Sequence, residues 1–162
     1  MKTLILVRHA KSSWKNASLA DIDRPLNKRG KRDAPKMGKR LAEQNVKIDL
    51  IITSPAKRTR KTASVFADHL SYKNEIIKES ALYDASNMAI LQLIRNLDDN
   101  SQTVMLVGHN PGLTNVVNRL SRVNIENVPT CGVVILGYDI DSWTKVDEVT
   151  PVWFDFDYPK KL

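Results

Sequence analysis

The chain has 162 residues, of which 42% are hydrophobic and 27% charged, as expected for one soluble domain that buries a core of its own. Its single cysteine, Cys131, excludes an intrachain disulfide, and no spacing of Cys and His resembles a zinc site. The formal net charge of +7 favours an anionic partner, such as a phosphorylated molecule, nucleic acid or an anionic membrane.

Short apolar runs rich in β-branched residues predict buried strands at 3–7, 49–53, 103–107 and 132–138. A further short strand is expected at Ile76-Ile77. In the tail, apolar residues alternate with acidic ones over 146–157, which indicates an extended edge strand or a hairpin.

Helical spacing of apolar residues predicts four helices, over 27–44, 56–70, 86–97 and 111–120. Asn27 is a suitable N-cap for the first of them, and Pro35 inside it predicts a kink or a second start. Ser86 or Asn87 begins the third, and Pro111 suits the first turn of the fourth.

The alternation of strands and helices predicts an α/β protein with helices on both faces of a mainly parallel central sheet, a three-layer α/β/α sandwich. No linker or internal repeat divides the chain, so residues 1–162 are expected to form a single domain. The few apolar residues before Arg8 do not resemble a secretory signal, and no apolar stretch has transmembrane length. We therefore expect a cytoplasmic protein without a membrane partner.

Two histidines stand where predicted strands end. Arg8-His9 follows the run 4–7, and Gly108-His109 follows the run 104–107. A third strand leads into the segment 54–63, which places Arg58 near the start of a helix. Ligands of open α/β sheets bind outside the carboxyl ends of the strands. The arrangement predicts nucleophilic chemistry on an anionic substrate at this edge.

Several further residues near these strand ends are suited to binding phosphate. Arginine presents a planar fork of donors that matches phosphate oxygens, and a helix N-terminus adds free amides. The expected substrate-binding residues, all in loops at this edge, are Lys11, Ser12, Ser13, Asn110 and Thr130.

Four motifs in this order resemble the histidine phosphatase superfamily. Arg8-His9-Ala10 is similar to its Arg-His-Gly motif, and Pro25–Gly30 to its Pro-Leu-Thr-x-x-Gly segment. Residues 54–63 fit Ser-Pro-x-x-Arg-x-x-x-Thr-Ala, and Gly108-His109 fits the late Gly-His motif. The small size and the run Arg-His-Ala-Lys-Ser are most similar to SixA-type phosphohistidine phosphatases. The resemblance implies a phosphoglycerate mutase-like fold.

The resemblance also implies that His9 is the nucleophile, and that water hydrolyses the phosphohistidine formed on it. Near neutral pH a histidine keeps a large neutral fraction, so an imidazole lone pair is available for attack. Arg8, Arg58 and His109 would neutralise the charge of the transferred phosphoryl group. We expect no metal and no other cofactor, because the two arginines supply the charge that a magnesium ion provides elsewhere.

A general acid is expected only for substrates with a poor leaving group. Members of the family that cleave esters use a Glu or Asp in the middle of the chain, and here Asp84 is favoured over Glu79. The alternative is that Asp84 caps the helix that begins near Ser86. A phosphohistidine substrate would relax the need for an acid, because imidazole leaves phosphorus more readily than an alkoxide.

The compact chain predicts an open, shallow pocket, which suits phosphohistidine carried by a protein. Hydrolysis of small phosphate esters or sugar phosphates is the alternative. A competing class is a non-enzymatic binder of nucleic acid or another polyanion that uses the basic cluster from Arg24 to Arg40. That class leaves the two histidines unexplained, and the chain has no platform of stacking aromatics, so no nucleic-acid partner is expected. The basic cluster is otherwise interpreted as the solvated face of a helix.

Overall fold

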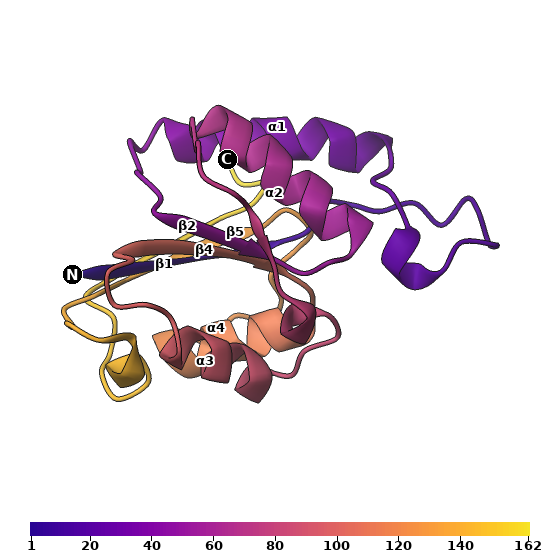
Figure 1. Cartoon of the computed structure of the whole chain (residues 1–162). Coiled ribbons are helices and arrows are strands. Elements are labelled where there is room, and N and C mark those ends of the chain that lie inside the picture. Colours follow the sequence, from indigo (N-terminus) through magenta and orange to yellow (C-terminus); the bar gives the residue numbers. More distant parts are fainter.

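The central sheet has six strands in the order β3-β2-β4-β1-β5-β6 in the computed structural model, which describes residues 1–162 (Figure 1). The strands are β1 (Lys2–Arg8), β2 (Leu50–Thr53), β3 (Ile77–Lys78), β4 (Thr103–Gly108), β5 (Val133–Tyr138) and β6 (Trp153–Asp157). The pairs β1/β4, β2/β4 and β2/β3 are parallel, whereas β5 is antiparallel to both β1 and β6. Only β5 runs against the other strands, so the prediction of a mainly parallel sheet is confirmed.

Helices cover both faces of this sheet, which confirms the three-layer architecture (Figure 1). They are α1 (Lys28–Ala42), α2 (Lys57–His69), α3 (Asn87–Arg95) and α4 (Gly112–Ser121). The alternating side chains of β1 divide the core in two. Ile5 and Val7 pack with apolar residues of α1 and α2, and Leu4 and Leu6 pack with those of α3 and α4. None of the helices combines the length and the apolar character that crossing a bilayer requires.

Helix α1 begins at its predicted cap. The Asn27 side chain accepts a hydrogen bond from the amide of Gly30 at 2.9 Å. The helix continues through Pro35 as one element, so the expected second start is absent. Ser86 caps α3 in the same way by accepting from the amide of Ala89.

The tail differs from its predicted course. The edge strand is confirmed, but it is confined to Trp153–Asp157. Residues before it do not extend along the sheet, because Trp143 and Val146 are fully buried in the core. The indole of Trp143 also donates to the carbonyl of Ser101 at 2.9 Å, which fixes a turn there.

The register of the parallel strands brings the functional loops to one edge. Arg8 of β1 lies opposite Gly108 of β4, and Thr53 of β2 lies opposite Val107. The next residue along each strand is therefore His9, His109 or Ser54 at the same carboxyl edge. This alignment explains how residues far apart in the sequence form one site.

Gly30 allows α1 to approach the loop that follows β1. A Cβ atom on Gly30 would lie 2.1 Å from the carbonyl oxygen of Lys11, which also accepts from the amide of Asn27 at 3.0 Å. No side chain fits at that distance. This steric constraint explains why a glycine stands at the last position of the Pro25–Gly30 motif.

We expect Gly30→Ala to lower the free energy of unfolding by about 1–3 kcal/mol, the usual cost of overpacking. Gly108→Ala is the matched control, because nothing lies within 4 Å of its added Cβ. We expect it to change the stability by less than about 0.5 kcal/mol. Urea denaturation measures both values, and equal effects would contradict the steric role of Gly30.

Candidate active site

The rings of His9 and His109 lie side by side at the carboxyl edge of the sheet. Their centroids are 5.3 Å apart, and the ring planes are inclined by 54°. Arg58 approaches the same pair, with Nη2 3.4 Å from Nδ1 of His109. Arg8, adjacent to His9 in the chain, is close enough for its charge to lower the pKa of both histidines. The structure thus brings together the four residues predicted from the strand ends.

The orientation of His9 is set by its own backbone neighbour. Nδ1 lies 2.7 Å from the carbonyl oxygen of Ala10. Because a carbonyl only accepts hydrogen bonds, Nδ1 carries the proton, and the lone pair of the neutral ring is on Nε2. The residue is 8% exposed, and this burial lowers the pKa of His9 to about 3, with a further contribution from the nearby positive charges. Near neutral pH the ring is therefore an uncharged potential nucleophile.

His109 is also held as a neutral ring. Nε2 lies 2.8 Å from Oγ of Ser54, and Nδ1 faces Arg58. Since a guanidinium only donates, Nδ1 accepts from Arg58, and Nε2 donates to Ser54. Burial, and secondly the charge of Arg58, lower the pKa of His109 to about 4. The role of Ser54 was not predicted from the sequence, although it opens one of the four motifs.

The spacing within the segment 54–63 has a structural reason. Arg58 and Thr62 are four residues apart, and so they share one face of α2. The Thr62 hydroxyl donates to the carbonyl of Arg58 at 2.8 Å and accepts from the amide of Ala10 at 3.0 Å. Thr62 therefore ties the helix that presents Arg58 to the loop that presents His9.

Two buried donors in this region have no partner. Among buried side-chain nitrogen and oxygen atoms, only Nε of Arg8, Nε of Arg58 and the hydroxyl of Tyr138 lack a hydrogen bond. Buried polar groups are satisfied in the great majority of cases, so an unpaired donor needs an explanation. Two guanidinium donors beside a neutral imidazole are suited to an anion that completes their hydrogen bonds.

Asp21 also belongs to this cluster of side chains. No role was predicted for it from the sequence. Its carboxylate accepts from Arg58 at 3.0 Å, from the Tyr83 hydroxyl at 2.6 Å and from Nε of Arg24 at 3.1 Å. The hydrogen bond from Tyr83, and then that from Arg58, hold the pKa of Asp21 below its usual value. Asp21 thus stays ionised and fixes the Arg58 guanidinium. Only tertiary structure reveals this, because Arg58 and Tyr83 lie in other segments.

A cavity of about 260 Å³ opens beside His109 and Arg58, and His9, whose ring lies 5.3 Å from that of His109, is not part of its lining. It is lined by Asp21, Arg58, Tyr83, Asp84, His109 and Asn110. Asp84 is exposed at this cavity in a left-handed backbone conformation, with φ at 54°. Since Ser86 is the N-cap of α3, the alternative that Asp84 caps this helix is wrong. Its function as a proton donor stays a prediction.

The Asn110 side chain has a positioning role. Its Nδ2 donates to Asn127 and to the carbonyl of Val128, and its Oδ1 accepts from the amide and hydroxyl of Thr114. The same Val128 carbonyl accepts from Arg8 at 3.0 Å. All the donors of the Asn110 amide group are thus engaged in holding the loop that anchors Arg8. Direct substrate binding by Asn110 stays a prediction.

The other predicted phosphate ligands lie outside the cavity lining. Lys11, Ser12 and Ser13 line a larger neighbouring groove. The Ser12 hydroxyl accepts from Arg24 at 2.8 Å, and that of Ser13 accepts from the amide of Lys15. Thr130 is buried next to Cys131, whose amide donates to the carbonyls of Arg8 and His9, but its side chain does not line the cavity. Substrate binding by these four residues stays a prediction.

Comparisons with known proteins agree with this geometry. The family model of the histidine phosphatase superfamily (branch 1) matches residues 4–90. An uncharacterized chloroplastic protein of Arabidopsis thaliana has 34% sequence identity to this chain. The match covers 88% of this chain and 69% of the Arabidopsis protein. A similar solved structure is that of the "putative phosphohistidine phosphatase SixA" of Agrobacterium tumefaciens, with a sequence identity of 29% and a TM-score of 0.77. The match covers 85% of this chain and 92% of the Agrobacterium chain.

A third similar structure is the protein histidine phosphatase SixA complexed with tungstate. It is 18% identical, covers 96% of this chain and 94% of its own, and has a TM-score of 0.78, which supports the fold alone. The α/β/α fold and the paired histidines define a phosphoglycerate mutase-like domain. The chain belongs to the histidine phosphatase superfamily, as its motifs predicted.

The lowered pKa values predict that His9 and His109 stay neutral from pH 7.5 down to pH 5. We expect ¹⁵N spectra of the ring nitrogens, assigned with His9→Gln and His109→Gln, to remain constant over this range. The unfolded chain, with histidine pKa values near 6.5, binds more protons between about pH 4 and 6.5. The free energy of unfolding should therefore rise with pH across that window. A midpoint near 6.5 for either ring would contradict the assignment.

We expect Asp21→Asn to lower kcat by about 10²-fold, because a misplaced Arg58 no longer stabilises the transferred phosphoryl group. KM for a phosphate substrate should not rise, since the substitution also removes a negative charge from the cavity. Steady-state kinetics separates the two constants. Asp23→Asn is the control, because Asp23 is exposed in the same turn and forms no ion pair. A higher KM with an unchanged kcat would show that Asp21 does not position Arg58.

Proposed function

We propose that the protein is a phosphatase that removes the phosphoryl group from phosphohistidine in another protein, with His9 as nucleophile. The observation that carries this proposal is the hydrogen bond from His9 Nδ1 to the carbonyl of Ala10. It leaves the Nε2 lone pair available in a neutral, buried ring. The fixed cations Arg8 and Arg58 beside that ring are suited to a dianionic phosphoryl group.

The proposed reaction has two steps. Nε2 of His9 attacks phosphorus, so that the new N–P bond forms as the N–P bond of the substrate histidine breaks, and the leaving imidazole takes up a proton from the solvent. Water then attacks the phosphohistidine. A P–O bond forms, the bond to Nε2 breaks, and inorganic phosphate departs with the oxygen of the water, which returns a proton to the solvent. Arg8, Arg58 and His109 contribute mainly by position and by preorganised charge.

The substrate class follows from the proton requirement. An ester needs a donor for its alkoxide, whereas an imidazole leaves with less assistance. His109 is neutral, and Asp21 is ionised and bound by three donors. The remaining candidate is Asp84, which is exposed at the cavity. Its presence there supports the second candidate function, hydrolysis of small phosphate esters or sugar phosphates, which would depend on Asp84.

We expect kcat/KM for a phosphohistidine peptide to exceed that for p-nitrophenyl phosphate and sugar phosphates by more than about tenfold, a difference of 1.4 kcal/mol in transition-state stabilisation. Asp84→Asn should leave the hydrolysis of the peptide within about twofold of the wild type and should reduce that of the esters. Release of inorganic phosphate measures both activities.

Two variants serve as controls for this comparison. His9→Gln should abolish hydrolysis of every substrate, and Arg58→Ala should reduce it by about 10²–10³-fold, as does the loss of an oxyanion donor. A preference for esters that disappears in Asp84→Asn would support the second function instead. Activity that survives in His9→Gln would reject both.

A further inference from the structure

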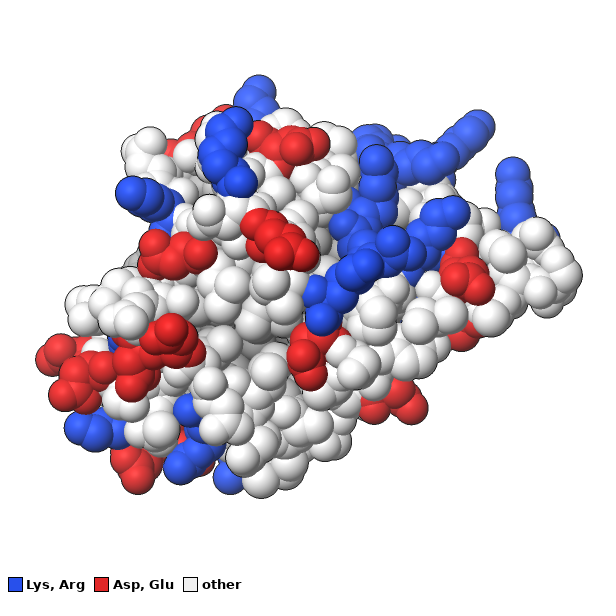
Figure 2. All heavy atoms as spheres, in the orientation of Figure 1, with Lys and Arg blue, Asp and Glu red and all other residues white.

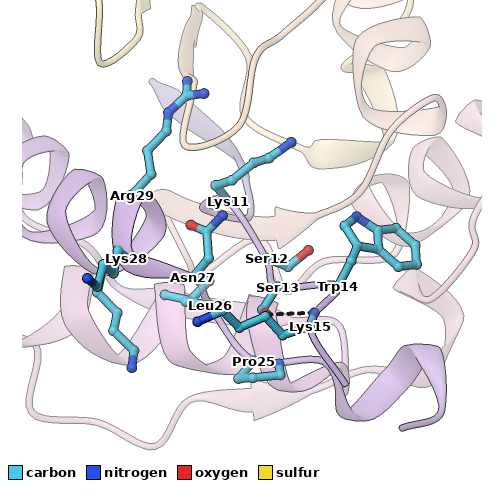
Figure 3. A pocket seen from close by; sticks show the side chains of 11 residues that line it. Lys11, Ser12, Ser13, Trp14, Lys15, Pro25, Leu26, Asn27, Lys28 and Arg29 are labelled. Atoms are coloured by element: carbon cyan, nitrogen blue, oxygen red, sulfur yellow. Dashed lines mark hydrogen bonds between the residues drawn. The ribbon is translucent and has the colours of Figure 1, made fainter. Parts of the chain in front are cut away.

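A hollow larger than the active-site cavity is lined by five cations. It has a volume of about 970 Å³ and is formed by the loop after β1 and the start of α1 (Figure 3). An adjoining hollow of about 440 Å³ shares Pro25, Leu26 and Lys31 with it and extends to the start of α2. We call the two hollows together the basic groove. Its cations are Lys11, Lys15, Lys28, Arg29, Lys31, Lys57, Arg60 and Lys61.

Most of these cations have no counter-charge within the protein. Only Arg29 has a carboxylate within 4 Å, that of Asp33 at 3.3 Å. The other seven form no ion pair, and all but Lys11 are exposed. Figure 2 shows Lys and Arg gathered over the region where α1 and α2 begin, whereas the acidic side chains lie mostly elsewhere on this face. The basic groove is therefore available to an anionic partner.

The placement of these charges opposes helix stability. The N-terminus of a helix carries a partial positive charge, which acidic side chains in the first turn normally compensate. Neither α1 nor α2 has an acidic residue there. Lys28 and Lys31 lie in the first turn or next to it in α1, and Lys57 opens α2. This arrangement costs stability, and the binding of an anionic partner gives a reason for it.

The basic groove is continuous with the loop that carries the nucleophile. Lys11 follows His9 by two residues, and Ser12 forms a β-bridge with Leu26. Arg24 lies between groove and cavity, where it donates to Ser12 on one side and to Asp21 on the other. A phosphorylated peptide or protein would therefore extend into the groove when its phosphoryl group lies at His9, provided that it is longer than a few residues.

We propose that the basic groove binds an acidic surface segment of the phosphorylated protein substrate, next to its phosphohistidine; this inference rests on the proposed function. Rows of exposed lysines complement carboxylates and raise the rate of association. Trp14, 73% exposed at the edge of the groove, adds an apolar contact. A nucleic acid fits less well. Arg24 covers one face of the Trp14 ring at 3.5 Å, and no second aromatic lines the groove for base stacking.

The test uses two phosphohistidine peptides that differ only in their flanking residues, Asp and Glu in one and Ser and Gln in the other. We expect the wild type at low salt to hydrolyse the acidic peptide with a kcat/KM about tenfold higher, and the difference to shrink as salt is added. The triple variant Lys15→Glu, Lys28→Glu, Lys31→Glu should lose this preference. Its melting temperature should equal or exceed that of the wild type, because two of the new carboxylates lie near the start of α1.

The matched control is the triple variant Lys47→Glu, Lys73→Glu, Lys78→Glu. It changes the net charge equally at exposed lysines that line neither hollow, and it should keep the preference for the acidic peptide.

Equal rates for the two peptides with the wild type would overturn the inference but not the proposed function. Failure to hydrolyse either peptide, with esters still cleaved, would overturn the proposed function itself. Inhibition by a single-stranded DNA oligonucleotide at lower concentrations than the unphosphorylated acidic peptide would assign the groove to nucleic acid instead.

Discussion

The hydrogen bond between Nδ1 of His9 and the carbonyl of Ala10 is the contact on which the chemistry of the site depends. It fixes the tautomer, and burial keeps the ring uncharged, so that the lone pair of Nε2 is available near neutral pH. An imidazole free to rotate would expose either nitrogen, and a solvated one would be partly protonated. The arginines beside it then provide charge without protonating the nucleophile. Their own buried Nε donors lack partners in the protein.

The surrounding fold is arranged to hold this loop in place. Parallel pairing of β1, β2 and β4 brings His9, Ser54 and His109 to one edge. The Thr62 hydroxyl binds the amide of Ala10, and the absence of a side chain at Gly30 lets α1 lie against the next carbonyl. The family motifs therefore preserve contacts between segments as well as reacting groups. A sequence that matched only the reacting groups would not specify the geometry.

Local patterns in the sequence were sufficient to predict the layers of the fold and to identify the four central residues of the site. Short β-branched runs mark the strands, and Arg8, His9, Arg58 and His109 stand directly after strands or near the start of a helix. Asp21 was missed because its contacts with Arg58 and Tyr83 exist only in the folded chain. The extended strand or hairpin predicted over 146–157 was too long, because alternation alone does not reveal that Val146 turns into the core. The contacts of the Asn110 side chain with Thr114 and Val128 were also not predicted, because they join segments that lie apart in the sequence or depend on the folded loop.

The most direct test of the account is to identify the nitrogen that carries the phosphoryl group in the reaction intermediate. The protein is labelled with ¹⁵N-histidine, mixed with a phosphohistidine peptide and quenched at high pH, where phosphohistidine survives. Phosphorus–nitrogen coupling in the spectrum then identifies the bonded atom. We expect a bond to Nε2 of His9. Phosphorus on Nδ1 of His9, on another residue, or on no residue of the enzyme during turnover would contradict it.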